Sequence, residues 1–277
     1  IPISFAVLIL KTMGALPYIA MVFEPFFKLM GLPGESAIVF VTAFFLNIYS
    51  CIIVIETLGL AGRAVTILAL MCLIAHAIPV ESAVQKKTGS SFFGITITRI
   101  AASFSGAFIL HLLLPADTVE SSVNALGAGL GFGAEFNAWL VGTGKISIKI
   151  LTLITSLMIL QRLLEEFGIT KLLSLICKYP LMILGIPPGA SILWIIANTL
   201  GLGYGAGVLI DHVERKKISL KNARILNYHI AISHSLLEDT LLFAAIGVSA
   251  WWITLPRVVL AGIAVWLKRL FDFVKSK

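Results

Sequence analysis

Two eight-residue stretches decide the fold of this chain: Ala75-His76-Ala77-Ile78-Pro79-Val80-Glu81-Ser82 and Ser233-His234-Ser235-Leu236-Leu237-Glu238-Asp239-Thr240. The second follows the first by 158 residues, and each carries a histidine and at least one carboxylate within an apolar segment. The same spacing pairs Gly89 with Gly247 and Arg99 with Arg257. Apolar halves that repeat, with ionisable residues and breaks at matching places, are the pattern from which many transporters build a central site.

A second repeated block lies upstream, where Gly31-Leu32-Pro33 recurs 154 residues later as Gly185-Ile186-Pro187. Because proline fixes φ and lacks a donor, these turns should precede helices. We therefore predict one repeat over 1–116 and a second over 145–277. The Gly-rich segment 117–144 connects them and either crosses the membrane or re-enters it.

Composition places most of the surface in lipid. The chain is 58% hydrophobic and 13% charged, whereas soluble proteins carry about 25% charged residues. We predict an all-α polytopic integral membrane protein with about 8–10 transmembrane helices, and a soluble enzyme is excluded. The first residues already begin a span without a positive n-region, so a cleaved signal peptide is not visible in this sequence. Apolar spans are expected near 3–22, 36–58, 64–84, 91–115, 146–166, 189–210, 221–238 and 241–265.

The net charge of +7 comes largely from short basic loops, including Lys86-Lys87 and Arg215-Lys216-Lys217. Basic loops of this kind are typical of the cytoplasmic side of a membrane. The basic loop moves by one connection between the two copies, as inverted repeats predict. No platform of aromatic and basic residues accompanies the charges, so no nucleic-acid partner is expected.

The repeated stretches hold the first candidate site. Ionisable groups inside a span cost roughly 2.5–3.5 kcal/mol each on insertion scales, so they need a reason. Pro79 should break the helix between His76 and Glu81, whereas His234 and Glu238, four residues apart, should share one helical face.

Three interpretations of these side chains stay open. Imidazole and carboxylate form a plausible ligand set for a divalent cation, or a proton relay, with His76, Glu81, His234 and Glu238 as ligands. With Asp239 added, the same groups would line a site for a polar organic solute. Alternatively, they hydrogen-bond to one another and hold the two halves together.

Further candidate residues lie in the middle of the spans that follow the Gly-Pro turns. Asn47 and Ser50 in the first copy, and Asn198 and Tyr204 in the second, would meet a solute at a locally unwound segment. The glycines of 201–207 serve equally well for close helix packing. Arg99 and Arg257 are expected to pair with Glu81 and Asp239, with an anion clamp as the alternative.

The segment from Phe26 to Ser36, followed by Arg63 to Leu68, resembles the nucleoside-recognition or Gate domain. That domain occurs twice in the membrane part of ferrous-iron transport protein B, and it is also similar to parts of concentrative nucleoside transporters and spore maturation proteins A and B. The likeness covers most of both halves. The chain departs from the iron transporter by having His76 where that family has a cysteine.

The resemblance and the repeat together imply a transport protein, secondary-transporter-like or channel-like, with a midplane site between the repeats. The solute would be a divalent cation or a small polar molecule. A nucleoside-type solute is one alternative. Another is a non-transporting scaffold, as a homo-oligomer or beside a second Gate-domain subunit. No resident cofactor is expected beyond a bound divalent cation or coupling ion. No paired catalytic aspartates or His-Glu-x-x-His motif indicate an enzyme. The expected location is the cytoplasmic (inner) membrane of a prokaryote.

Overall fold

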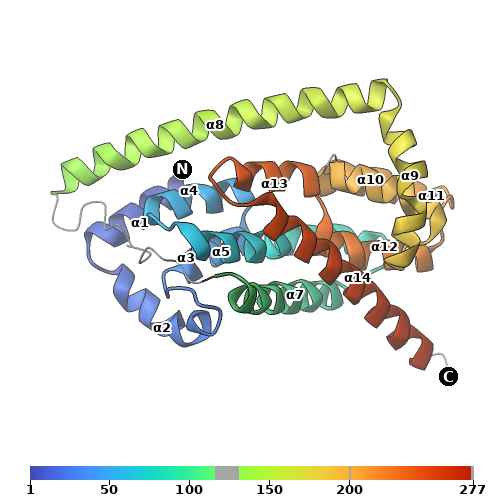
Figure 1. Ribbon diagram of the computed structural model, residues 1–277, viewed down its shortest axis with the longest axis horizontal. Coiled ribbons are helices and arrows are strands. Elements are labelled where there is room, and N and C mark those ends of the chain that lie inside the picture. Colours follow the sequence, from blue (N-terminus) through green and yellow to red (C-terminus); the bar gives the residue numbers. More distant parts are fainter. Residues whose placement is uncertain (116–130, 200, 276–277) are drawn as a thin grey trace. The chain divides into compact units, whose positions relative to one another are not determined.

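The structure, a computed structural model, describes residues 1–115, 131–199 and 201–275, and only the backbone of 202–204. Every element in these ranges is helical (Figure 1). The first half contains α1 (Pro2–Thr12), α2 (Leu16–Lys28), α3 (Ser36–Phe45), α4 (Ile48–Leu58), α5 (Gly62–Ala75), α6 (Ile78–Lys87) and α7 (Phe92–Leu113). The second contains α8 (Phe132–Glu166), α9 (Ile169–Ile183), the 3₁₀ helix η1 (Pro188–Ala190), α10 (Ser191–Thr199), α11 (Gly201–Glu214), α12 (Leu220–Ser233), α13 (Leu236–Ala244) and α14 (Ala250–Lys275).

Four of the described helical segments are long and apolar enough to cross a bilayer. They are the α5–α6 pair, α7, α8 and α14, and α1 with α2 makes a fifth if that pair, bent by 103°, is one span. α8 has 35 residues, so it is about 52 Å long against a hydrocarbon core of about 30 Å. The other predicted spans, near 36–58, 189–210 and 221–238, consist of pairs of short helices.

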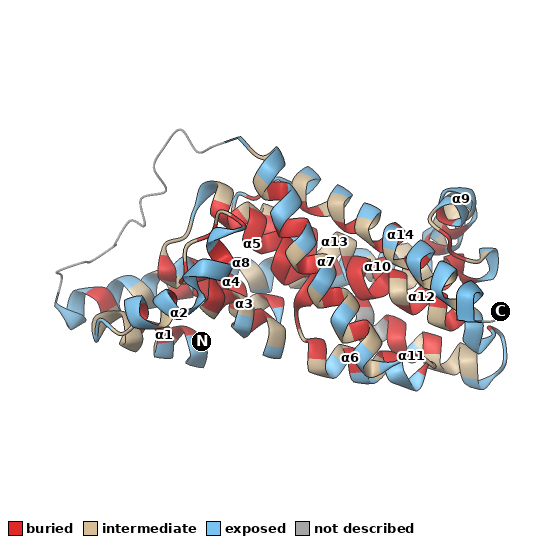
Figure 2. Cartoon of the chain, turned by 90° about the horizontal axis from the view of Figure 1, so that it is seen from below, coloured by how far each residue is buried: buried red, intermediate tan, exposed pale blue. Residues whose placement is uncertain are grey.

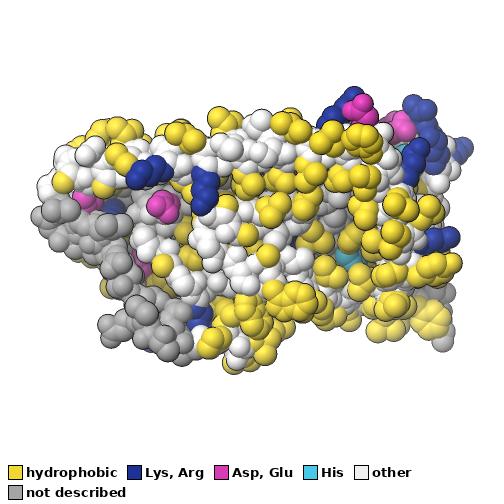
Figure 3. All heavy atoms as spheres, turned by 45° about the horizontal axis from the view of Figure 1, so that its top comes forward, with side chains coloured by type: hydrophobic (Ala, Val, Ile, Leu, Met, Phe, Trp, Pro, Cys, Tyr) yellow, Lys and Arg dark blue, Asp and Glu magenta, His cyan; other side chains and the backbone are white. Residues whose placement is uncertain are grey.

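The surface agrees with a lipid environment. Figure 3 shows hydrophobic side chains spread over one face with few charged groups among them. Large apolar side chains such as Ile148, Leu151 and Trp251 are exposed along the long helices. Such a surface would be unusual for a soluble protein. The prediction of an all-α integral membrane protein is confirmed, while the inverted orientation of the repeats stays a prediction.

The sequence repeat reappears in the helix boundaries. α5 and α12 begin at Gly62 and Leu220, 158 residues apart, and α6 and α13 begin at Ile78 and Leu236 with the same spacing. α7 and α14 follow at the same spacing again. The predicted final span near 241–265 was placed too early, because α13 continues to Ala244 and α14 starts only at Ala250.

Each repeated stretch contains a helix break, but not where the sequence predicted it. The breaks lie at Ala77 and Ser235, whose φ angles of 46° and 54° are in the left-handed region. Pro79 does not break a helix, because it is the second residue of α6, where its missing N–H costs nothing. The prediction that His234 and Glu238 share one face of an unbroken helix is wrong, since the break separates them.

The breaks are closed by equivalent hydrogen bonds. The Ala77 N–H donates to the carbonyl of Ala43 at 2.8 Å, and the Ser235 N–H donates to the carbonyl of Ala197 at 3.0 Å. Each bond joins a break to the C-terminal part of another short helix, α3 in the first case and α10 in the second. Backbone groups freed by a break at membrane depth must find such partners within the protein.

The prediction that the Gly-Pro turns precede helices is confirmed, since α3 begins at Ser36 and η1 at Pro188, and the same turns also end the helices before them. Gly31 and Gly185 adopt φ angles of 66° and 81°, which glycine reaches without strain. The next N–H donates back to the carbonyl of Phe27 in the first copy and of Leu181 in the second. Backbone bonds of this kind satisfy carbonyls at the C-terminus of a helix.

The chain forms two compact units that do not follow the repeat boundaries. The first unit contains 1–77, 103–153 and 243–253, and the second contains 78–102, 154–242 and 254–277. Each unit therefore takes segments from both halves of the sequence. The boundaries predicted at 116 and 145 stay a prediction, because compactness groups residues differently from repetition.

Each unit has its own apolar core. In the first, α5 is buried along almost its whole length (Figure 2). In the second, the core joins residues of α9, α10, α11 and α12, including Leu193, Leu209 and Leu226. Part of the predicted connecting segment, 132–144, belongs to α8, and 116–130 lies outside the described residues.

Candidate functional site

A buried charged cluster lies beside the break of the second unit. Glu81, in the first turn of α6, accepts a bond from Arg99 Nη1 at 2.5 Å through its Oε2. Its other oxygen lies 3.3 Å from His234 Nε2. Arg99 and His234 are almost fully buried, and the Glu81 side chain is 14% exposed. Each oxygen of the Glu81 carboxylate therefore contacts a buried basic side chain.

Hydrogen bonding fixes which imidazole nitrogen carries a hydrogen. His234 Nδ1 lies 2.8 Å from the carbonyl oxygen of Ile230. A carbonyl only accepts, so Nδ1 must be the donor. In a neutral ring Nε2 is then an acceptor, and it faces a carboxylate oxygen that is also an acceptor. The contact between His234 and Glu81 is favourable only when a proton or a metal cation lies between them.

The helix break at Ser235 determines the position of the His234 side chain. His234 is the C-terminal cap of α12 and has an extended ψ of 159°, so its ring lies at the point where the helix stops. The residue that follows, Ser235, donates to Ala197. The imidazole is thus held by its own helix and by the crossing of α12 with α10.

A second arginine supports the same region. The Arg257 guanidinium donates to the carbonyls of Ile232, at 3.2 Å, and His234. These are the carbonyls that the break leaves without helical partners. Its Nη2 also lies 3.8 Å from Asp239 Oδ2. The predicted pairing of Arg99 with Glu81 and Arg257 with Asp239 is confirmed by both contacts.

Hydroxyl pairs beside these ion pairs repeat as well. The Thr96 hydroxyl donates to Ser82 Oγ at 3.0 Å, and Thr240 and Thr254 are joined in the same way at 3.2 Å. Ser82 directly follows Glu81 in the sequence, and Thr240 directly follows Asp239. A hydrogen bond between two helices therefore lies beside each carboxylate, between α6 and α7 in the first case and between α13 and α14 in the second.

Glu238 lies in the first turn of α13, next to Asp239. A Cβ atom added at Gly201 would stand 3.7 Å from Glu238 Oε2 and 3.2 Å from Ser235 Oγ. Gly201 opens α11 with a φ of 76°. The glycine therefore lets the backbone at the start of α11 approach the carboxylate closely.

His76 belongs to the first unit, where it caps α5 as His234 caps α12. Its Nδ1 lies 3.2 Å from the carbonyl of Cys72, four residues earlier, as His234 does from Ile230. The duplicated sequence thus produces the same ring orientation relative to the helix in both copies.

The remaining predicted site residues have different surroundings. Asn47 is exposed, and its side-chain oxygen accepts the Ser50 N–H at 2.9 Å, which caps α4. Asn198 is buried; its Nδ2 donates to the Trp194 carbonyl at 2.9 Å. Its Oδ1 has no partner within the described part of the chain. The side chain of Tyr204 lies outside the described residues.

Sequence reasoning missed a polar group around His229, in the middle of α12. The Trp194 indole N–H donates to His229 Nδ1 at 3.0 Å, and Ser233 Oγ lies 2.8 Å from the same nitrogen. His229 is fully buried, and its Nε2 has no partner among the described residues. The signal was available: the first copy has Met71 where the second has His229.

No protein-family profile matches the chain, and no solved structure matches it. The chain is similar to the uncharacterized membrane protein YvoD of Bacillus subtilis strain 168, with 28% identity over 267 residues. The alignment covers 94% of this chain and 85% of that relative. The likeness and the apolar helices lead to one conclusion: this is a polytopic helical membrane protein.

Proposed function

We propose that the protein is a secondary-transporter-like membrane protein, and that Glu81 and His234 bind a cation at the centre of its transport site. The observation that carries this proposal is the contact between two acceptors, His234 Nε2 and Glu81 Oε1, in a buried setting. Burying such a pair is costly unless a cation joins its members.

The surrounding backbone supports a transport role. Discontinuous helices near the bilayer midplane are a common way for transporters to expose polar groups to a substrate. Here α12 and α13 are interrupted where His234 lies, and the break contacts the end of α10.

The distance admits either of two cations. Two ligands at about 2.0–2.1 Å from Zn²⁺ in a tetrahedral site lie about 3.3–3.4 Å apart, close to the observed 3.3 Å. A hydrogen bond through a shared proton is about 2.7–3.2 Å long, slightly shorter than this separation. Charge favours the proton: Arg99 and Arg257 already lie beside Glu81 and Asp239, and a divalent cation would add two positive charges to this buried cluster where a proton adds one.

The test is a thermal-unfolding panel on the purified protein with Zn²⁺, Mn²⁺ and uridine, each across pH 5 to 8. The proposal expects one ligand, or protonation, to raise the melting temperature of the wild type and to have little effect on His234→Gln. His212→Gln is the matched control, because His212 Nδ1 also lies near the carbonyl four residues earlier but outside the cluster. Uptake of a stabilising ligand into proteoliposomes with an imposed pH gradient then measures transport.

The rival function is a scaffold, in which the same cluster only holds helices together. If no ligand or pH change shifts the wild type, and His234→Gln and His212→Gln respond alike, the cation site is excluded and the scaffold takes its place. A ligand response without gradient-dependent uptake would keep the site and reject coupled transport.

A further inference from the structure

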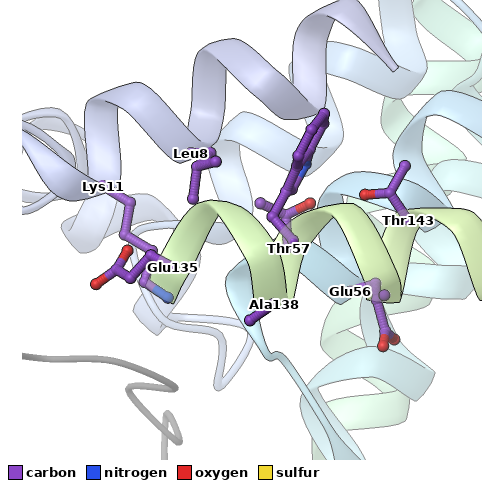
Figure 4. A pocket seen from close by; sticks show the side chains of 9 residues that line it. Leu8, Lys11, Glu56, Thr57, Glu135, Ala138 and Thr143 are labelled. Carbon is purple, nitrogen blue, oxygen red and sulfur yellow. The ribbon is translucent and has the colours of Figure 1, made fainter. Parts of the chain in front are cut away.

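A second polar site lies in the first unit, away from the cluster described above. A cavity of about 80 Å³ is bordered by residues of three helices, namely Leu8 and Lys11 of α1, Glu56 and Thr57 of α4, and Glu135, Ala138, Trp139, Gly142 and Thr143 of α8 (Figure 4). Figure 4 shows Lys11 and Glu135 at one end of this pocket, with Glu56 and Thr143 towards the other.

A buried carboxylate borders this pocket and indicates that the pocket is a ligand site. Glu135 is only 9% exposed, and its Oε2 has no hydrogen-bond partner among the described residues. A buried carboxylate oxygen without a donor is costly. Glu135 borders the cavity, so a donor that enters the cavity can reach this oxygen. The pocket therefore calls for a ligand that carries N–H donors and a positive charge.

The size of the cavity limits that ligand. A cavity of about 10–15 Å³ on this measure holds one water molecule, so a cavity of about 80 Å³ accepts a group of several heavy atoms. A two-carbon primary ammonium fits this volume, whereas a trimethylammonium group has no N–H to donate. A primary ammonium offers three donors, enough to serve Glu135 Oε2 and a hydroxyl such as that of Thr57, which also borders the pocket.

The position of the pocket indicates where such an ammonium would come from. Trp139 contacts Phe5 and Phe136 with ring centroids 5.3 and 5.7 Å apart, and Phe136 stacks on Phe132. Tryptophan side chains are enriched at the membrane–water interface, where lipid headgroups lie. Ala138 is exposed and Gly142 half-buried, and both are small, so little side-chain bulk covers the wall formed by α8.

Lys11 supplies the complementary charge. Two carboxylates, Glu56 and Glu135, border the pocket together with this one ammonium. A headgroup that carries a phosphate and a primary ammonium can direct the phosphate to Lys11 and the ammonium to Glu135. Phosphoethanolamine has both groups two carbons apart.

We propose that this pocket binds the headgroup of a phosphatidylethanolamine lipid, with the ammonium donating to Glu135. The site is independent of the cation site at Glu81 and His234, so either can fail without the other.

Native mass spectrometry of the purified protein with added lipid tests the proposal. Phosphatidylethanolamine should bind at least about tenfold more tightly than phosphatidylcholine, because a charge-assisted hydrogen bond is lost with the latter. Glu135→Gln should remove this preference, whereas Glu166→Gln, an exposed change on the same helix, should keep it. Phosphatidylglycerol and free ethanolamine complete the panel.

Equal binding of the two zwitterionic lipids by the wild type would overturn the proposal, and so would an unchanged preference in Glu135→Gln. Tighter binding of phosphatidylglycerol would make the site a simple anion patch and also overturn it. Glu135-dependent binding of free ethanolamine without the lipid would reject the lipid as occupant. If Glu135→Gln does not fold, Ala138→Leu narrows the pocket from an exposed position and should abolish the preference instead.

Discussion

The two helix breaks, at Ala77 in the first unit and Ser235 in the second, have the same backbone conformation but differ in the side chains that surround them. Both have a positive φ, both donate to an alanine carbonyl of another short helix, and both follow a histidine. Around Ser235 the neighbouring helices carry Trp194, Asn198 and His229.

The equivalent positions around Ala77 hold Phe40, Phe44 and Met71. One copy is thus packed with apolar side chains, while the other carries buried polar groups. The comparison teaches that the duplication preserves the backbone geometry of the break while the side chains that surround it have changed from apolar to polar.

The largest effect is expected where the two copies agree. Arg99→Met and Arg257→Met should each lower the free energy of unfolding by about 3–5 kcal/mol, because each leaves a buried carboxylate without its cation. The measurement is unfolding of the purified protein in detergent. Arg215→Met is the control: its pair with Asp211 is exposed, and such pairs contribute little.

If one of these two variants unfolds like the wild type, the ion pairs are not equivalent and the duplication does not extend to energetics. A smaller loss in the double variant Arg99→Met/Glu81→Met than in Arg99→Met would show that the unpaired carboxylate causes the cost.

A smaller effect should separate the copies. His229→Met removes the acceptor of the Trp194 indole N–H, so it should cost about 1–3 kcal/mol. In a protein that already carries Trp194→Phe, His229→Met should cost much less, because the indole N–H is no longer there to be left unpaired. The double-mutant cycle of these two changes should therefore show a coupling of at least about 0.5 kcal/mol. Met71→Leu, at the matching position of the first copy, should cost less than about 1.5 kcal/mol. Strictly additive effects of His229→Met and Trp194→Phe would mean that the polar group does not stabilise the second copy.

The smallest effect concerns the breaks themselves. Ala77→Gly and Ser235→Gly should range from neutral to a gain of about 1 kcal/mol, because glycine adopts a positive φ without the strain of a Cβ. Ala77→Val and Ser235→Val should lose stability, since branched side chains tolerate this region poorly. Equal unfolding curves for the glycine and valine variants would argue that the breaks are not held at a positive φ in solution.

Much of the architecture was predictable because the chain repeats itself. The Gly-Pro turns, the apolar spans and the pairing of Arg99 with Glu81 follow from residue spacing and from the cost of a buried charge. The contact between Glu81 and His234 could not be derived, because it joins segments from different repeats. No local pattern reports which of two duplicated segments a residue will meet.

The break positions were missed for a different reason. Pro79 was the obvious helix breaker, but proline is compatible with the first turn of a helix, and it occupies that turn here. The actual breaks fall at Ala77 and Ser235, whose intrinsic preferences give no warning. Tertiary hydrogen bonds to Ala43 and Ala197 hold these residues in place, and such bonds are not visible in the sequence.

The second unit joins segments that lie far apart in the sequence, and this has a consequence for biosynthesis. Gln85 Nε2 donates to the carbonyl of Asn227, and the two residues are 142 positions apart in the chain. Asn227 Nδ2 also reaches Thr88 and Ser90. At about 5–20 residues per second, a ribosome needs about 7–28 s to make the intervening chain. During that interval α6 leaves the ribosome before its partners exist, so an insertase or chaperone has time to meet its polar surface.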